Sequence, residues 1–400
     1  MRYIARKLPP GPRETNGLAS PVFVEGRARS IRVVGVGPHG RPRRVDRPLR
    51  GRHPAKVPGR KGVGSGAERV YERRVSLARE ALAWLVYLLP IGQRRHRLFF
   101  RWKLTYPQAI VRGYLRRRIR GSVGVDPDFA HPRRFTELLQ VYKFEHRDPR
   151  FAILADKYRV RAHLEAKGYG HLLVPLRAVG RRFEDIDLEG LPDAFVVKVN
   201  HDSGGVFVVR DKHSTDFESM RREVNARLAL PYVRAVELGE WNYVHIDPRV
   251  IVEDYLEDAS GNLRDYKVHC FGGEPVYVQV DADRFEHHTR AFYDLDWNRL
   301  DFALGFPRSP TDVDRPTPLE SMLQACRELS ADFPYVRIDF YCVGDRLYFG
   351  EFTFFHGSGV EAFDPDERDF EFGQRLRAAM KKPSTRSPSR DQVHLPDVVE

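Results

Sequence analysis

The stretch VRIDFYCVGDRLYFGEFT, residues 336–353, predicts two β-strands joined near Gly344-Asp345, with acidic residues in mid-strand, where acids are uncommon. A three-residue turn over 344–346 would place Asp339 opposite Glu351 and Arg337 opposite Thr353, all on one face. The other face would then carry apolar residues, namely Ile338, Phe340, Cys342, Tyr348 and Phe352. A two-residue turn would instead split the acids between the faces, because a one-residue slip inverts every side chain.

The facing acids suggest a bound cation. Two carboxylates with Cβ atoms roughly 5 Å apart repel each other unless a cation lies between them. The three-residue turn therefore predicts a divalent metal site at Asp339 and Glu351. Ligands that are all oxygen atoms favour Mg²⁺ or Mn²⁺ over zinc. The alternative is an exposed sheet face on which the charges are solvated.

Composition limits the class of protein. The 400 residues are 42% hydrophobic, enough for a large core and more than one lobe. Residues 1–120 hold 30 Lys and Arg against 6 Asp and Glu, whereas residues 121–400 hold 37 against 49. Because the part expected to fold is acidic, we expect no general nucleic-acid partner. Three scattered cysteines and the lack of a run of roughly 18 apolar residues predict a cytoplasmic protein.

The two ends of the chain differ from its centre. Residues 1–75 are rich in Arg, Pro and Gly and are predicted to form a disordered basic tail. Residues 376–400 are predicted to form a disordered C-terminal tail. No predicted helix, strand or site residue after residue 70 needs residues 1–70, so these residues are also consistent with a translation start placed too far upstream. Residues 76–125 predict a basic amphipathic helical segment. This segment is suited either to docking on an anionic membrane through residues 80–120, at the inner membrane face, or to packing on the acidic body.

The centre alternates helices and strands. Helices are predicted at 136–147, 155–168 and 318–331, and strands at 193–200, 206–211, 249–257, 264–271, 274–281 and 289–296. Lys198 lies on the strand at 193–200, next to a Gly-rich loop whose backbone N–H groups are suited to phosphate. A plain hairpin with an outward lysine is the alternative. Lys157, predicted in the first turn of a helix, suggests an anionic partner, unless it is simply solvated.

The order of these features resembles the TupA-like branch of the ATP-grasp superfamily. The resemblance covers roughly residues 130–375 and is carried by stretches such as FTELLQVYKFEHRDPRF, LADKYRVR, LPDAFVVKVNHDSGG, RVIVEDYLED, FPYVRIDFY and YFGEFTFFHGSG. It implies an α+β ATP-grasp fold, in which two lobes clasp ATP and Mg²⁺ (or Mn²⁺) between antiparallel sheets. The lobes would be an N-terminal subdomain at 126–190, a small lobe at 191–258 and a catalytic lobe at 259–375.

The resemblance also implies roles for individual residues. Lys157 and Lys198 would contact the phosphates of ATP, and the loop residues Ser203, Gly204 and Gly205 would close over them. Glu253 and Tyr255 would lie at the adenine, and Asp265 and Lys267 near the ribose and the transferred phosphate. The metal ligands would be Asp339, Glu351 and Thr353, and the catalytic residues Arg337 and Lys267.

Two positions depart from the pattern of the family, and a third is a separate candidate. Thr353 stands where most ATP-grasp enzymes have Asn, and Asp202 stands where relatives have Gly, which adds a negative charge near the phosphates. His356 precedes Gly357-Ser358-Gly359, a segment suited to a flexible acceptor site, or it is a histidine of a surface loop.

By the same resemblance, the chain would be a carbon–nitrogen ligase of teichuronopeptide-type polysaccharide biosynthesis at the cell envelope. ATP would phosphorylate a carboxylate, and an amine would attack the acylphosphate. It would join an amino acid or peptide to the polysaccharide or its precursor. The alternatives are a kinase acting on a sugar and a non-catalytic protein that binds an anionic polymer through its basic N-terminal part.

Overall fold

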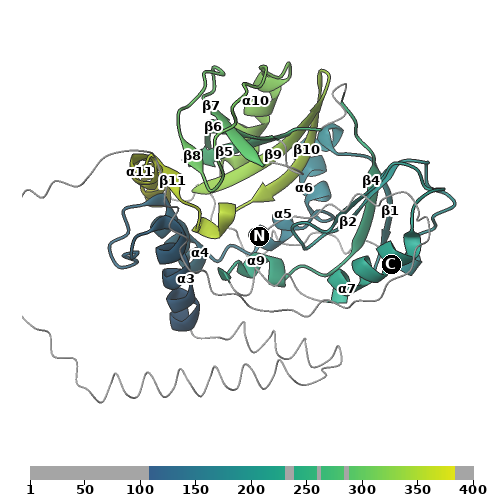
Figure 1. Cartoon of the computed structure of the whole chain (residues 1–400), viewed down its shortest axis with the longest axis horizontal. Helices are drawn as coiled ribbons and strands as arrows, with labels where there is room; N and C mark the ends of the chain where they lie inside the picture. The colour runs from purple at the N-terminus through teal and green to yellow at the C-terminus, as the bar shows by residue number, and fades with distance from the viewer. Residues whose placement is uncertain (1–107, 230–237, 259–262, 283–287, 383–400) are drawn as a thin grey trace, which may run out of the picture. The chain divides into compact units, whose positions relative to one another are not determined.

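The computed structural model describes residues 108–229, 238–258, 263–282 and 288–382, which belong to one compact unit. Helices combine with two main antiparallel sheets, which confirms the predicted α+β class (Figure 1). The predicted tail at 1–75 lies outside the described residues, as does most of the predicted helical segment. Among the helices that the structure does describe, none is long and apolar enough to cross a membrane.

A four-stranded sheet forms the smaller lobe. Its order is β1-β4-β2-β3, with β1 at Leu176–Gly180, β2 at Phe195–Val199, β3 at Val206–Val209 and β4 at Val250–Asp254. Helix α7 (Phe217–Ala229) packs on one face, where Val224 joins Val197 and Val252 in a buried cluster. Strand β1 was not predicted, and the predicted domain boundary between residues 190 and 191 passes through this sheet.

The larger sheet has the order β10-β9-β5-β6-β7. Its strands are β5 (Asp265–Phe271), β6 (Glu274–Ala282), β7 (Thr289–Tyr293), β9 (Tyr335–Val343) and β10 (Arg346–Thr353). Successive side chains of a strand point to opposite faces. Val268, Ile338 and Phe340 therefore share an apolar face, which packs against helix α10 (Leu319–Ser330). The other face carries ionisable side chains and is called the site face below.

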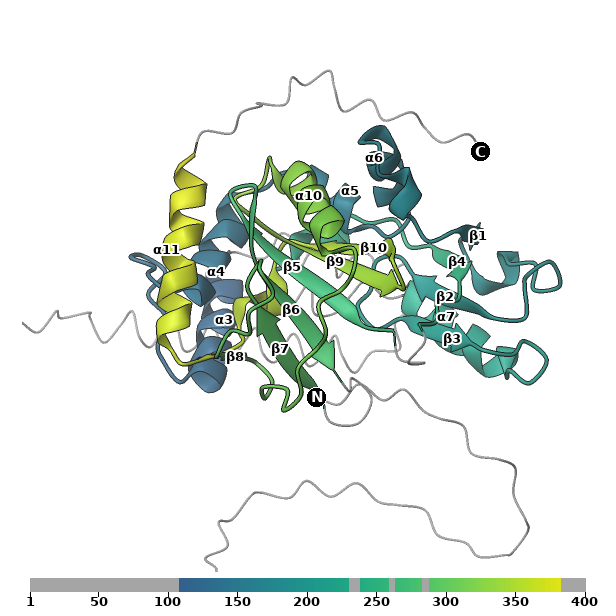
Figure 2. The ribbon, with the colours of Figure 1, turned by 90° about the horizontal axis from the view of Figure 1, so that it is seen from above.

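Helices α4 (Phe135–Glu145) and α11 (Glu367–Lys381) lie side by side (Figure 2) and cover one end of the site face. The buried Asp369 carboxylate accepts hydrogen bonds from the backbone N–H and the hydroxyl of Thr136, at 2.9 and 2.8 Å. Helix α11 continues into the tail predicted from residue 376, so that prediction was wrong up to Lys381. Residues 383–400 lie outside the described residues.

Short elements complete the described part. They are helices α3 (Gln108–Val123), α5 (Arg150–Ala155), α6 (Val160–Ala166) and α9 (Trp241–Val244), the 3₁₀ turns η1 (Gly170–Leu172), η2 (Phe183–Asp185) and η3 (His356–Gly359), and the paired strands β8 (Ala303–Leu304) and β11 (Phe363–Asp364). Lys157 lies in the turn between α5 and α6. Its prediction in the first turn of a helix was wrong, because α6 begins only at Val160.

The β9–β10 hairpin corrects the predicted turn but keeps the predicted pairing. Arg346 pairs with Val343, so the turn has two residues. A β-bulge at Gly350 then shifts the register, and Glu351 pairs with Asp339 as predicted. Because the bulge inverts the strand before it, Leu347 and Phe349 join the apolar core instead of Tyr348. A Cβ at Gly350 would lie only 3.0 Å from the backbone oxygen of Asp339, so the bulge needs glycine there.

Candidate active site

The Arg337 guanidinium lies between the two acids of the hairpin. Its Nε and Nη2 donate to both oxygens of Asp339, at 2.6 and 2.7 Å, and Nη2 also donates to Glu351 Oε1 at 3.1 Å. The Thr353 hydroxyl accepts from Nη2 and donates to Glu351, both at 3.0 Å. A side chain of the hairpin itself thus relieves the repulsion between the acids, and their register alone does not require a metal ion.

Lys267 adds a second buried cation. Its ammonium group, on β5, lies 3.0 Å from Asp339, 3.1 Å from Asp265 and 3.7 Å from Asp281. Burial alone would raise the pKa of Asp281, but Lys267 and Arg290 lower it far below its ordinary value. Asp281 is therefore ionised, and lysine or arginine side chains lie in contact with each of these carboxylates at the centre of the site face.

Two lysines reach the site from outside the large sheet. Lys157 Nζ donates to the backbone oxygen of Asp202 at 2.8 Å and lies 3.7 Å from Glu351 Oε2. Burial would raise the pKa of Glu351, but Lys157, Arg337 and Lys267 together lower it to about 2. The Glu351 carboxylate is therefore ionised at neutral pH.

Lys198, on β2, pairs with Glu253 on β4 rather than facing solvent. The two are 2.6 Å apart, and Arg161 Nη1 lies 3.2 Å from the other oxygen of Glu253. Burial would lower the pKa of Lys198, but Glu253 raises it above its ordinary value, so the lysine stays charged. Glu253 thus holds two cations on the site side of the small lobe.

The Gly-rich loop after β2 is built around Asp202. Arg227 of helix α7 donates to Asp202 Oδ2 at 2.6 Å, so the negative charge that the sequence places in this loop has a cationic partner. Ser203 and Gly204 are exposed at the tip, and Gly204 has a φ of 101°, in the left-handed region that favours glycine. A Cβ at Gly205 would lie 3.1 Å from Asp202 Oδ2.

The small sheet presents exposed apolar side chains beside these lysines. Val206 and Val208 on β3 are 47% and 50% exposed. They share a face with Lys198 and Glu253, because Val206 pairs with Lys198 and Val208 with Val196, which in turn pairs with Glu253. Tyr255 follows the end of β4, and its hydroxyl donates to Glu257 at 3.3 Å. Neither valine was predicted from the sequence as a site residue.

A second layer of polar groups lies behind Arg337. His356 Nδ1 is 2.7 Å from Arg337 Nη1, and His356 Nε2 is 3.1 Å from Glu361 Oε2. Arg290 Nη1 donates to Glu361 at 2.8 Å, and its Nε lies 3.4 Å from Asp281. His356 is only 3% exposed, so the prediction of a surface histidine was wrong.

The turn that carries His356 is anchored rather than flexible. Gln140 donates to the backbone oxygens of Ser358 and Gly359, at 3.0 and 2.9 Å, and the buried Lys143 donates to that of Ser358 at 3.0 Å. Sequence reasoning missed these anchors and also Arg161, Arg227, Arg290 and Glu361. Their signal was weak, because each lies far along the chain from its partner.

The donor set can be tested against a metal ion and a nucleotide. Asp339, Glu351 and Thr353 offer only oxygen atoms, and the described part of the chain contains no cluster of three or more His, Cys, Asp or Glu suited to a metal. Mg²⁺ commonly takes one or two carboxylates and completes its shell with phosphate and water. The residues therefore fit Mg²⁺ carried by a nucleotide and do not form an all-protein zinc cage.

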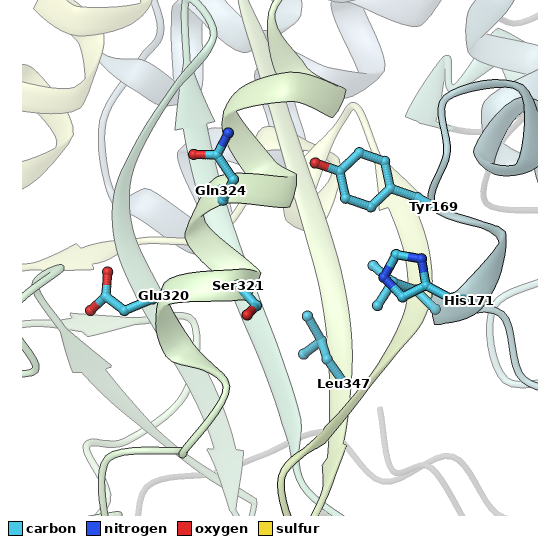
Figure 3. A pocket seen from close by; sticks show the side chains of 7 residues that line it. Tyr169, His171, Glu320, Ser321, Gln324 and Leu347 are labelled. Carbon is cyan, nitrogen blue, oxygen red and sulfur yellow. The ribbon is translucent and has the colours of Figure 1, made fainter.

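A separate pocket, shown in Figure 3, has a volume of about 380 Å³. Its lining residues come from η1 and the residue before it, from α10 and from β10, namely Tyr169, His171, Leu172, Glu320, Ser321, Gln324 and Leu347. Leu347 belongs to the apolar face of the large sheet, so the pocket opens on the side opposite the site face. None of the predicted site residues lines it.

Comparisons with solved structures give distant similarities. The D-alanine–D-alanine ligase of Bacillus anthracis complexed with ATP is 18% identical, with a TM-score of 0.35, over 58% of this chain and 69% of that chain. The Helicobacter pylori enzyme is 14% identical, with a TM-score of 0.32, over 62% and 69%. The ATP-grasp ligase PsnB, complexed with a precursor variant, Mg and ADP, is 11% identical, with a TM-score of 0.33, over 62% and 66%.

No curated protein matches the sequence significantly. A family model described as TupA-like ATPgrasp matches residues 137–377, which is more than half of the chain and includes both sheets. The predicted ATP-grasp fold is thereby confirmed. The chain belongs to the TupA-like ATP-grasp family.

Proposed function

We propose that this protein is an ATP-dependent carboxylate–amine ligase that acts through an acylphosphate. The observation that carries the proposal is a cluster of charged side chains on the site face. Asp339 and Glu351 each lie within 4 Å of cationic groups, which belong to Arg337, Lys267 and Lys157. Membership of the ATP-grasp family supports the assignment to ATP. The site places three cationic side chains beside two carboxylates that could hold a metal ion, an arrangement suited to catalysis on a nucleotide phosphate.

The nucleotide would bind between Lys157 and Lys198, which lie outside the large sheet, and Lys267, which lies on it. Lys157 and Lys198 would contact its phosphates, and Ser203, Gly204 and Gly205 would cover them with backbone N–H groups. The exposed Val206 and Val208 offer an apolar surface for the adenine, beside Glu253 and Tyr255, and Asp265 would lie near the ribose. When bound by Asp339, Glu351 and Thr353, Mg²⁺ would neutralise phosphate charge.

The reaction needs charge and position rather than a nucleophilic side chain. A substrate carboxylate oxygen attacks the γ-phosphorus, the bond from phosphorus to the β–γ bridging oxygen breaks, and ADP leaves. The amine then attacks the acyl carbon, phosphate departs with the C–O electrons, and the nitrogen loses a proton to give the amide. Arg337 and Lys267 would stabilise the negative charge that develops in both steps.

The substrates that we propose are an amino acid or peptide and a cell-envelope polysaccharide or its precursor. This part of the proposal rests on the family alone. An anionic partner at the membrane also fits the helix α3, whose Arg117, Arg118 and Arg120 are exposed. Such a surface is suited to peripheral contact with an anionic membrane.

The test is a screen for release of ADP and phosphate over amino acids paired with uronic acids, with mass analysis of the products. Release that requires both a carboxylate and an amine, with a conjugate of the two, is the expected result. Asp339→Asn should abolish it, whereas Asp345→Asn, an exposed acid in the turn of the same hairpin, should not. A phosphorylated sugar without free phosphate would identify a kinase instead, and no Mg-ATP binding at all would favour a non-catalytic binding protein.

A further inference from the structure

A closed ring of polar contacts surrounds the back of the site. Arg337 contacts Asp339, which contacts Lys267, which contacts Asp281. Asp281 contacts Arg290, and the ring returns to Arg337 through Glu361 and His356. The proposed chemistry uses Arg337, Lys267 and Asp339. It assigns nothing to His356 and Glu361.

The backbone is shaped around the Glu361 carboxylate at two separate places. Gly305 has a φ of 66° and Gly357 a φ of 53°. A Cβ at either glycine would lie 2.7 or 2.6 Å from the Glu361 side chain, closer than real Cβ contacts. Two loops distant in sequence therefore leave room for one acidic side chain. Glycine adopts this backbone conformation without strain, and the lack of a side chain at both positions leaves the space that Glu361 fills.

The contacts of His356 fix its tautomer. Arg337 can only donate, so Nδ1 of His356 accepts at 2.7 Å and the ring proton is on Nε2, which faces Glu361. Burial, followed by the nearby Arg337 and Arg290, lowers the pKa of His356, although Glu361 opposes this. A neutral imidazole with a proton on Nε2 accepts the hydrogen bond from Arg337 and carries its proton on the side of the Glu361 carboxylate, at an N···O distance of 3.1 Å.

A purely structural explanation is weak for such a cluster. Buried ion pairs seldom stabilise a fold more than apolar side chains of similar size would. Arg337 and Arg290 are 9% and 6% exposed, and the His356 side chain is almost fully buried. What the cluster does achieve is to hold the Nη1 side of the Arg337 guanidinium in place while its other nitrogens face the acids.

We propose that His356, anchored by Glu361, is a positioning residue for Arg337. It aims the guanidinium at the place where negative charge develops on the transferred phosphoryl group. This inference rests on the proposed function, since it assumes that Arg337 acts on that group. Its consequence is that only the Nδ1 acceptor of His356 matters for the chemistry, and the Nε2 side serves to hold the ring.

Two substitutions at one position separate these sides. His356→Asn keeps an amide oxygen near the place of Nδ1 and loses the contact with Glu361. His356→Gln places its amide nearer to Nε2 and loses the acceptor for Arg337. Both remove the ring, so each is the other's control for the lost packing, and thermal unfolding shows how similarly they fold.

The probes are Mg²⁺ with ADP, and Mg²⁺ with ADP and aluminium fluoride, which mimics the transferred phosphoryl group. The ratio of the two affinities measures stabilisation of that group alone. We expect the ratio in His356→Asn to stay near the wild-type value. In His356→Gln it should fall about tenfold or more, as for loss of a hydrogen bond to a charged group.

Equal ratios in the two variants would overturn the inference while leaving the proposed function intact. Failure of the wild-type protein to bind Mg-ADP would overturn both. A second readout does not depend on the ligand: in protein labelled with ¹⁵N-histidine, His356 should show the neutral form protonated on Nε2. An imidazolium, or a proton on Nδ1, between pH 6 and 8 would contradict the geometry proposed for Arg337.

Discussion

Replacing Lys267 by methionine should destabilise the protein more than any exposed lysine substitution. Lys267 is 4% exposed, and its ammonium group lies within 3.1 Å of Asp339 and Asp265 and 3.7 Å from Asp281. Each contact near 3 Å is worth about 5 kcal/mol at an effective dielectric constant of 20, before the cost of removing the charges from water. Since breaking a buried ion pair typically costs about 3–5 kcal/mol, we expect a loss of that size at pH 8.

The assay is chemical denaturation of wild-type and variant protein at pH 8 and pH 5. Without Lys267 the pKa of Asp281 should rise, because Lys267 is the largest of the charges that lower it against the effect of burial. Protonation then relieves the repulsion, so the loss should be smaller at pH 5. Lys167→Met, at an exposed position, is the control and should cost less than about 0.5 kcal/mol. A loss below about 1 kcal/mol at pH 8 would refute the reasoning.

Three further predictions concern the site and its support. The pKa of Glu351 is lowered to about 2, so the stability that this carboxylate contributes is complete above about pH 4.5 and disappears as the pH falls toward 2. Lys157→Met should raise that pKa and lower the stability at pH 7 by an amount that shrinks below pH 4. Denaturation midpoints measure this loss, and a difference that does not depend on pH would contradict the prediction. Arg227→Met should weaken Mg-ATP binding about tenfold in calorimetry, because the negative charge of Asp202 loses its cationic partner. The double variant with Asp202→Asn should recover most of the affinity, and equal losses in the single and double variants would exclude this coupling. Gly373→Ala should cost about 3 kcal/mol or more, because its Cβ would lie under 3 Å from backbone atoms of the segment before α4; unchanged thermal unfolding would disprove this close approach of α11.

Strand patterns in the sequence predicted the core of the fold well. Strands β2, β5 and β6 lie within a residue or two of their predicted ranges, because their alternating apolar side chains pack on one face. Strand β1 and helix α7 were missed. Each buries few large side chains, so its pattern is weak without the sheet on which it packs.

The hairpin shows what sequence reasoning could and could not reach. The pairing of Asp339 with Glu351 was predicted correctly, but the turn was wrong because the bulge at Gly350 was not foreseen. A glycine inside a strand is the signal for such a bulge. The repulsion between the two acids did not by itself require a metal ion, because the Arg337 guanidinium donates to both of them.

Residues brought together by tertiary structure were beyond the sequence pattern. Arg227 meets Asp202 from a helix that was not predicted, and Glu361 meets His356 only because Gly357 and Gly305 leave room for it. His356 was predicted to be exposed because it precedes glycine and serine. Its turn is buried because Gln140 and Lys143 of α4 bind the carbonyl oxygens.

The central claim is that Asp339 and Glu351 bind the divalent ion that accompanies ATP. The most direct measurement is calorimetric titration with ATP in the presence of Mg²⁺ and in the presence of EDTA, for the wild-type protein, Asp339→Asn and the control Asp345→Asn. We predict Mg²⁺-dependent binding in the wild-type protein and the control, weakened at least tenfold in Asp339→Asn. Equal affinity of all three proteins, or binding that does not depend on Mg²⁺, would contradict the assignment of the site.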